Sequence, residues 1–459
     1  MGATLAIVVG AGQASPWLPR RGWLASPAAL GMASLSAELA LFPVSALLFS
    51  RVTVAGLFLN FLAVPVMAVG QVAGMATLAL SAVGLRLAAA AGWLAHLSAW
   101  SLAESAAWVE YVPWLSRRVP PPAPLVMIAY YAAVGGCLLF SGEWARARWP
   151  QGGAVRWRRA MAAAAVAAAL WIVADPASEA ALALGRPRTL RATFLDVGQG
   201  DATLIQLPGG RSLLVDAGGG SDTFDLGARV VAPALWRSGV RRLDALVITH
   251  GDPDHIGGAP AVLRDFAPRE VWDGVPVPPH EPMRLLREQA LARRVVWRTV
   301  RDGDRARIGE VEVRVWHPAP PDWERQEVRN DDSLVLEIRY GCVSIVLPGD
   351  IGRATELALA PHFAPAGLRI LKAAHHGSGT SSAAGFLRAL RPDLVVFSSG
   401  RDNPYGHPVP AVVRRVRQAG AAIVRTDRDG AVSLETDGVR VRVGTYAGSR
   451  TAWRAACAR

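Results

Sequence analysis

Two imidazoles and two carboxylates lie within six residues in the segment 250–255, which reads His-Gly-Asp-Pro-Asp-His. Mostly apolar, β-prone residues (243–249) come before it, so the sequence predicts that a buried strand opens into a loop at His250. Gly257-Gly258 then allows a tight turn into a helix. Imidazole nitrogens and carboxylate oxygens are the ligands that hold a catalytic divalent metal. The loop therefore predicts a metal site whose ligands are His250, Asp252, Asp254 and His255.

Further polar clusters follow other predicted strands. Asp216 comes directly after an apolar run, Gly349-Asp350 ends a second one, and His375-His376 follows a third. Of the nine histidines in the chain, five lie in such clusters: His250, His255, His375, His376 and His407. Scattered core or surface histidines would not gather in this way. We therefore expect these loops to converge on one site.

The elements that must position these clusters are short strands and helices. Strands are predicted at 192–197, 203–207, 212–215, 245–249, 311–316, 334–339, 343–347, 368–372, 393–398, 421–425 and 438–443. Helices are predicted at 224–237, 352–360, 382–390 and 409–418. The strands come first in antiparallel runs and then alternate with helices. This order fits an α/β domain over residues 191–445, with two sheets sandwiched between helices.

The first part of the chain has a different composition. Apolar residues make up 51% of the sequence and charged residues 19%, and the apolar excess lies before residue 175. Residues 52–85 contain no ionisable side chain, a run longer than the ~20 residues that cross a bilayer. We expect an all-α membrane domain at 1–175 with five or six spans, then a linker at 176–190. Further candidate spans are 2–15, 35–50, 87–103, 119–142 and 160–174, and residues 446–459 are expected to form a C-terminal tail.

Arginines in the short loops predict the orientation of this membrane domain. The loop 143–159 carries five arginines and should face the cytoplasm. Alternating spans then place eight arginines inside and three outside, and everything after Asp175 lies outside the cell membrane. The formal net charge of +12 permits modest attraction to a polyanion but does not establish nucleic-acid binding. The three cysteines are so widely separated that the sequence predicts no disulfide framework: Cys137, Cys342 and Cys457.

The metal loop resembles the His-x-His-x-Asp-His signature of the metallo-β-lactamase superfamily. This resemblance implies an αββα sandwich in which Asp216 braces the metal loop from behind and Asp350 bridges two metals. Asp252 stands where most members place a second His. A harder oxygen ligand shifts the preferred metal from zinc toward manganese or magnesium, so the identity of the two divalent ions stays open.

The whole chain resembles the ComEC competence proteins, the inner-membrane channels of bacterial DNA uptake. The resemblance is carried, in order along the chain, by the motifs at 37–43, 60–65, 196–202, 250–255, 347–350, 372–378 and 400–408. It implies an inner-membrane location, with DNA, the lipid bilayer and other competence proteins as partners. Family members usually begin with further spans and an OB-like domain. The resemblance therefore implies a truncated form, a gene fragment, or one half of a split pair whose other chain supplies that part.

The two resemblances together imply residue roles. His250 and Asp252 would hold one ion, Asp254 and His255 the other, and Asp350 would bridge them. His375 is the preferred remaining ligand and His376 its rival, while residues 330–332 stand where a further His is usual. Lys372 is the only lysine in the chain, and we expect it to neutralise a phosphate oxygen. We expect His407 to donate a proton or to position the phosphate. Asp201 is expected to contact the metal-activated water.

Three functions fit these features. The leading hypothesis is a DNA-uptake protein whose outer domain is a metal-dependent nuclease acting on the strand that is not transported. The alternatives are a membrane-tethered hydrolase of another phosphodiester or ester, and a transport component with a purely structural metal site. Aromatic residues that stack bases beside the site would favour DNA. The candidates are Trp272, Trp316, Trp323 and Tyr405.

Overall fold

The computed structural model describes residues 24–142, 148–149, 152–175, 188–221, 224–319 and 324–457, together with residues 4, 7 and 8. The chain divides into two compact units, residues 1–177 and 178–459. Their boundary falls within two residues of the membrane-domain end expected from composition. Each unit is described by itself below.

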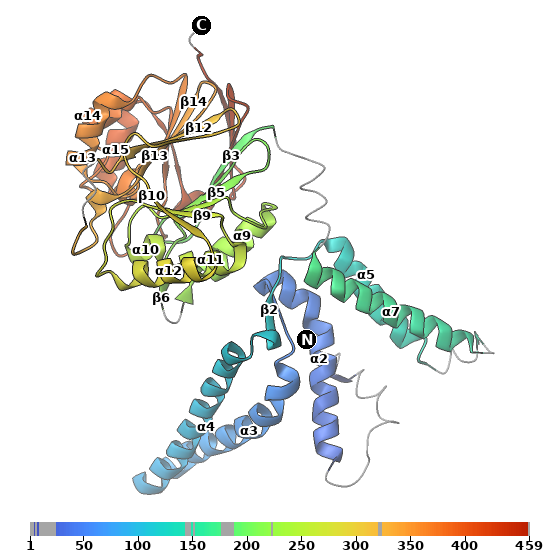
Figure 1. Cartoon of the computed structure of the whole chain (residues 1–459). Helices are drawn as coiled ribbons and strands as arrows, with labels where there is room; N and C mark the ends of the chain where they lie inside the picture. The colour runs from blue at the N-terminus through green and yellow to red at the C-terminus, as the bar shows by residue number, and fades with distance from the viewer. Residues whose placement is uncertain are drawn as a thin grey trace. The chain divides into compact units, whose positions relative to one another are not determined.

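The N-terminal unit is built from long apolar helices. In its described part these are α2 (Ala25–Phe49), α3 (Gly56–Ser81), α4 (Leu85–Tyr111), α5 (Pro124–Leu139) and α7 (Gly153–Ala174). Helix α3 lies along α4, and α5 lies along α7 (Figure 1). A short antiparallel ribbon of β1 (Arg51–Thr53) and β2 (Ser116–Arg118) joins the loops between helices. Polar contacts also link neighbouring helices, because the Tyr130 hydroxyl donates to the Leu39 carbonyl (2.8 Å) and the Asn60 amide to the Ser34 hydroxyl (3.0 Å).

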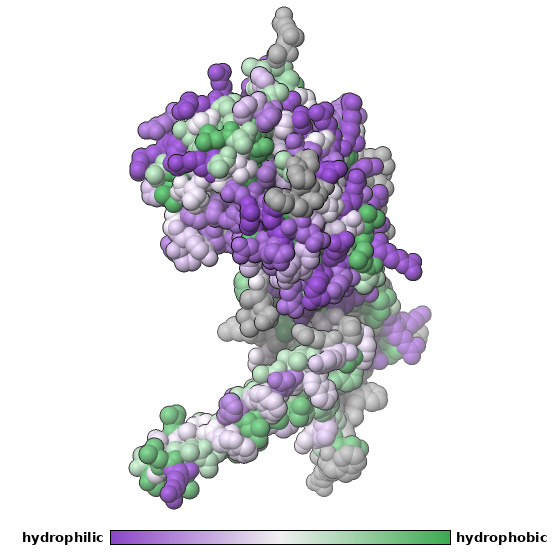
Figure 2. Space-filling view, turned by 60° about the vertical axis from the view of Figure 1, so that its left-hand side comes forward, coloured by the Kyte–Doolittle hydropathy of each residue, from purple (hydrophilic) through white to green (hydrophobic). Residues whose placement is uncertain are grey.

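Three of these helices, α2, α3 and α7, are long and apolar enough to cross a membrane, and α5 is a shorter apolar helix. Most of the uncharged run 52–85 forms one helix, α3, with Pro65 inside it. Large apolar side chains on these helices are exposed, and Leu78 is 77% exposed. In Figure 2 the helices of this unit are mostly pale or green, whereas the visible surface of the C-terminal unit is mostly hydrophilic. Such exposure suits contact with lipid, as the composition predicted. The expected span at 2–15 lies almost entirely outside the described residues.

Two sheets form the centre of the C-terminal unit (Figure 1). The strands of the first sheet, in spatial order, are β10 (Val296–Thr299), β9 (Glu270–Asp273), β8 (Ala245–Val247), β5 (Ser212–Val215), β4 (Thr203–Gln206), β3 (Leu190–Phe194), β18 (Val432–Thr436), β19 (Arg440–Thr445) and β20 (Arg450–Arg454). Those of the second are β11 (Arg305–Ile308), β12 (Val311–His317), β13 (Val335–Tyr340), β14 (Val343–Leu347), β15 (Leu368–Lys372), β16 (Leu394–Phe397) and β17 (Ala422–Arg425). In each sheet an antiparallel part continues into a parallel part.

The inner faces of the two sheets bury one apolar core, to which Phe194, Val247, Leu336 and Ile370 contribute. Helices α9 (Ala232–Arg237), α11 (Ala259–Phe266) and α12 (Glu281–Ala292) cover the outer face of the first sheet. Helices α13 (Arg353–Leu359), α14 (Ala384–Leu390) and α15 (Pro410–Gln418) cover that of the second. The predicted αββα sandwich is therefore confirmed.

Several elements differ from the sequence-based expectation. Residues 224–237 are not one helix, because a two-stranded ribbon of β6 (Gly220–Ser221) and β7 (Phe224–Asp225) and a π-helical turn (Gly227–Val231) precede α9. Strands β9, β10, β11, β18 and β20 and helix α12 were not expected. Strand β20 lies beyond residue 445, the expected end of the domain, and pairs with β19.

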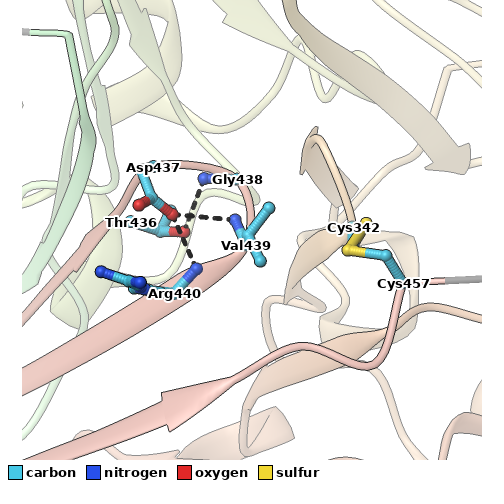
Figure 3. Close-up of a disulfide and its surroundings, with 7 residues drawn as sticks. All are labelled: Cys342, Thr436, Asp437, Gly438, Val439, Arg440 and Cys457. Carbon is cyan, nitrogen blue, oxygen red and sulfur yellow. Dashed lines mark hydrogen bonds between the residues drawn. A yellow bond between two sulfur atoms is a disulfide. The ribbon is translucent and has the colours of Figure 1, made fainter.

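The expectation of no disulfide was wrong. Cys342 lies in the turn between β13 and β14, and Cys457 follows β20; the two form a disulfide across a sequence separation of 115 residues (Figure 3). Separation along the chain does not limit separation in space, and here the second sheet's turn meets the end of the first sheet. Beside the disulfide, the Cys342 amide donates to the Gly438 carbonyl (2.7 Å) and the Ala456 amide to that of Gly367 (3.1 Å). The disulfide thus ties the end of the chain to the opposite sheet.

Candidate metal centre

The loops at the carboxyl ends of β3, β5, β8, β14, β15 and β16 supply the predicted site. In this αββα arrangement those strand ends meet at one edge of the sandwich. Among the described residues, one group of acidic and imidazole side chains could hold a metal ion: Asp201, His255, Asp350 and His376. All four are buried, and one ligand atom from each lies within 4.8 Å of the others. Loops up to 175 residues apart in sequence have therefore converged as expected.

Asp216 braces the metal loop from behind, as the resemblance implied. Its carboxylate accepts hydrogen bonds from the Thr249 amide and hydroxyl, each 2.8 Å long, and pairs with Nδ1 of His255 at 2.8 Å. The hydrogen of the Thr249 hydroxyl is thereby used, so this oxygen accepts from Nδ1 of His250 at 3.1 Å. Both imidazoles are held through Nδ1, which leaves Nε2 of each available as a ligand.

A glycine-dependent contact seats the segment 198–201 against the metal loop. The Asp201 amide donates to the Asp254 carbonyl at 3.1 Å. Gly200 has a positive φ of 131°, and a Cβ at this position would overlap that same carbonyl. A side chain here would therefore push Asp201 away from the cluster. The segment 198–201 is thus shaped to bring its acid into the site.

His376, and not His375, belongs to the buried cluster. The Nδ1 atom of His376 donates to the Ser398 carbonyl at 3.0 Å, and its Nε2 lies 3.2 Å from Asp254 and 3.3 Å from Asp350. The His375 side chain is 27% exposed, against 2% for His376, and its Nε2 lies 3.9 Å from Asp350. These contacts favour His376 as the ligand, whereas the sequence favoured His375 and left His376 as the alternative.

Lys372 lies beneath the cluster. Its ammonium contacts the Asp201 carboxylate and lies 3.5 Å from Asp350, and only 3% of its side chain is exposed. Burial alone would lower the pKa of Lys372, but Asp201 and Asp350 outweigh it and raise the pKa above its ordinary value. For Asp201, burial acts to raise the pKa, but the charges of Lys372 and His376 hold it below its usual range. Lys372 therefore stays charged and fixes two carboxylates from behind.

The orphaned atoms of the site fit a divalent metal. Nε2 of His250, His255 and His376 and Oδ1 of Asp350 are buried without a hydrogen-bond partner. Buried polar atoms normally have partners, so four such atoms together indicate a missing ligand. Burial would lower the pKa of His376, but Asp350 and Asp201 outweigh it and raise the pKa well above its ordinary value. A proton then occupies the His376 imidazole that a cation would otherwise use.

The position expected for the other ion is less enclosed. Asp252 is partly exposed, with its carboxylate 3.4 Å from Nε2 of His250. Of the residues 330–332, Asn330 lies nearest the cluster, with its amide 3.3 Å from Nε2 of His375. Asp331 instead accepts from the Gly352 amide and Thr355 hydroxyl, and Asp332 pairs with Arg325. Both carboxylates make these contacts outside the buried cluster, so they give no support for a replacement ligand.

His407 borders the cluster on its exposed side. Its ring centroid lies 5.8 Å from that of His375 and 6.4 Å from that of His376, and its Nδ1 is buried without a hydrogen-bond partner. Burial and the neighbouring His376 and His375 lower the pKa of His407. Of the predicted base-stacking residues, Trp272 and Trp316 belong to the buried core, whereas Tyr405 is 67% exposed and lies against the His407 ring. Trp323 lies outside the described residues.

Two hydroxyl residues with structural roles at the site were missed by the sequence reasoning. The Asp350 amide donates to the Ser333 hydroxyl at 3.1 Å, and the Ser398 hydroxyl donates to the Gly200 carbonyl at 2.9 Å. Ser398 also supplies the carbonyl that orients His376. The position of Ser398 at the end of a predicted strand was a usable signal. No comparable signal marked Ser333.

Comparisons with known proteins agree with this geometry. Residues 1–144 match the family model described as Competence protein, and residues 195–399 match that of the Metallo-beta-lactamase superfamily. The ComE operon protein 3 of Bacillus subtilis (strain 168) is 30% identical over 269 residues, covering 55% of this chain and 33% of that protein. Competence protein ComA of Neisseria gonorrhoeae is 34% identical over 244 residues, covering 53% of this chain and 32% of that protein. The chain thus spans about a third of the length of these relatives.

A solved structure also aligns with the C-terminal half. The metallo-beta-lactamase fold protein YhfI from Bacillus subtilis is 11% identical, with a TM-score of 0.37, and the alignment covers 54% of this chain and 100% of that one. The two family matches confirm the combination that the sequence predicted. The chain joins a segment that matches the competence-protein family model to a segment that matches the model of the metallo-beta-lactamase superfamily.

Proposed function

We propose that this chain acts in DNA uptake and that its C-terminal domain hydrolyses phosphodiester bonds of the strand that is not transported. The observation that carries the proposal is the set of buried, unpartnered imidazole nitrogens converging on Asp350, in a chain whose membrane domain matches competence proteins. Metallo-beta-lactamase folds serve many substrates, so the match to the superfamily alone does not choose the substrate. The competence domain favours DNA over an envelope polymer.

When bound, two divalent ions (manganese or zinc, with magnesium as the third candidate) would supply hydroxide near neutral pH and would neutralise charge on the phosphate. His255, Asp254, Asp350 and His376 would hold the inner ion, and His250 with Asp252 would hold the outer one. Asp216 and the Ser398 carbonyl fix the imidazole orientations.

The remaining site residues orient the attacking water, hold the carboxylates in place and position the phosphate. The buried Asp201 lies beside His376 and can orient the attacking water by accepting a hydrogen bond from it. Lys372 positions Asp201 and Asp350, in place of the direct phosphate contact that the sequence suggested, because its ammonium is buried against both. His407, whose lowered pKa keeps it neutral near pH 7, positions the phosphate, or takes up the proton released by the attacking water and passes it to the leaving oxygen.

A cleavage assay of the full chain in detergent tests this function. Single-stranded DNA should be cut with manganese, zinc or magnesium present, and cleavage should stop with EDTA and return when metal is restored. The Asp252→Ala/His255→Ala double variant is the inactive control, since it removes one ligand from each ion. Equal cleavage by this variant, or none by the wild type under all three metals, would leave the non-catalytic transport role as the better reading.

The disulfide supports placing the C-terminal domain outside the inner membrane. Disulfides persist in oxidising compartments and are rare in the cytosol, and Cys342–Cys457 lies in this domain. The arginine-rich loop 143–159 favours the same orientation. Both arguments are independent of the metal site.

This orientation predicts an oxidised cysteine pair in growing cells. In a Cys137→Ser background, acid-quenched and denatured cells should show no reaction with a polyethylene-glycol maleimide before reduction and two additions after it. The Cys342→Ser variant is the control, with one addition in both conditions. Two additions without reduction would place the domain on the cytoplasmic side.

A further inference from the structure

An open cavity of about 610 Å³ lies directly beside the candidate metal centre. His407 forms part of its wall, and the same ring borders His375 and His376. The rest of the wall comes from the loop after β16, which includes Arg401, and from the turn after β17, which includes Arg428. A substrate whose phosphate reaches the metals at His407 would therefore extend into this cavity.

The charges on the cavity wall favour a second phosphate. Arg425 and Asp427 neutralise one another through two hydrogen bonds of 2.9 and 2.6 Å. Arg401 donates its Nε to the Asp427 carbonyl at 3.3 Å, and no carboxylate of the described residues pairs with Arg401 or Arg428. Among the remaining charges of the cavity wall, the two guanidinium groups of Arg401 and Arg428 thus outnumber the one exposed carboxylate, that of Asp402. Guanidinium groups in such a setting bind phosphate oxygens well.

An exposed aromatic ring stands next to the same wall. Tyr405 is 67% exposed, and its ring lies nearly parallel to that of His407, with centroids 5.7 Å apart and an interplanar angle of 26°. Burial does not explain a tyrosine in this position. An exposed ring beside a row of phosphate-binding groups is the arrangement on which nucleobases stack in single-strand-binding sites.

We propose that this cavity is the subsite for the nucleotide next to the scissile phosphate. Arg401 and Arg428 bind the phosphate of that nucleotide, and Tyr405 stacks on a base. The inference rests on the proposed function and narrows it to polynucleotides with at least two phosphates. The site then selects a nucleic-acid strand over a small phosphodiester.

The test measures binding separately from cleavage. The probe is a fluorescein-labelled eight-residue oligothymidylate, and its anisotropy is followed with the full chain in detergent and EDTA across a salt series. Arg401→Ala/Arg428→Ala should weaken binding about tenfold and reduce the slope of log affinity against log salt by about 0.7, because the neutralisation of one phosphate is lost. Tyr405→Ala should weaken binding roughly tenfold, and Tyr405→Phe should restore it.

A matched control comes from a second basic cavity of about 500 Å³ on β18, β19 and β20, which contains Arg442 and Arg450. Arg442→Ala/Arg450→Ala removes the same charge and should leave the affinity and salt slope unchanged. Equal effects of the two double variants, or a wild type that does not bind the probe, would overturn the subsite.

A second readout separates this inference from the proposed function. With manganese, the ratio of kcat/KM for the oligonucleotide to that for bis(p-nitrophenyl) phosphate should fall about tenfold in Arg401→Ala/Arg428→Ala. Absence of any cleavage together with the expected binding differences would reject the nuclease and retain the nucleotide subsite. Normal cleavage with an unchanged ratio and unchanged binding would reject the subsite alone.

Discussion

Replacing His376 with alanine is expected to lower metal-dependent phosphodiester cleavage by at least about 10³-fold, more than the roughly 10- to 100-fold loss typical when a partner of a ligand is removed. The reason is its position: Nε2 faces Asp254 and Asp350 at 3.2 and 3.3 Å, while Nδ1 is fixed by the Ser398 carbonyl. The variant should also lose about one metal ion per chain, as measured by inductively coupled plasma mass spectrometry after dialysis.

The neighbouring His375 provides the matched control. It is the same residue type one position away, but its side chain is partly exposed and its Nε2 contacts the Asn330 amide. His375→Ala should keep both ions and lose less than about tenfold in rate, the scale of a weakened orienting contact. If His375→Ala loses an ion and His376→Ala does not, the assignment of the inner ligand is reversed.

The sequence alone could not decide which of these two histidines is the metal ligand. The order of motifs predicted that 250–255, 350 and 375–376 would meet, because each follows a strand. Strands β14 and β15 then proved to be parallel neighbours in one sheet, and β8 lies beside β5 in the other sheet. Which imidazole turns inward depends on the backbone after β15. His375 and His376 both have positive φ, of 49° and 54°, which no pattern of residue types announces.

The missed elements have similar physical causes. Strands β10 and β20 are exposed edge strands with one and two arginines, respectively, so they lack the apolar runs by which inner strands are identified. The disulfide was missed because only the closed sandwich brings residues 342 and 457 together. By contrast, β5, β14 and β15 are buried along their whole length, and their predicted bounds were the same as the observed ones.

Lys372 carries the second large expected effect, because it is a buried charge between two buried carboxylates. Lys372→Met keeps much of the side-chain volume but leaves Asp201 and Asp350 without their cation. Removing one partner of a buried ion pair costs about 3–5 kcal/mol, so the free energy of unfolding without metal should fall by about this amount. Urea denaturation of the full chain in EDTA, followed by the fluorescence of the tryptophans buried in the C-terminal domain, measures it.

Adding metal to the Lys372→Met variant distinguishes a positioning role of Lys372 from a merely structural one. A divalent ion bound by Asp350 and its neighbours supplies positive charge to the same carboxylates, so manganese should recover most of the lost stability in Lys372→Met. Cleavage should remain at least about 10²-fold below wild type, because Asp201 is no longer held in place. Lys372→Arg should not restore the rate, since a planar guanidinium does not fit the space of a buried ammonium. A Lys372→Met protein that is as stable in EDTA as the wild type would show that this lysine does not hold the two acids together.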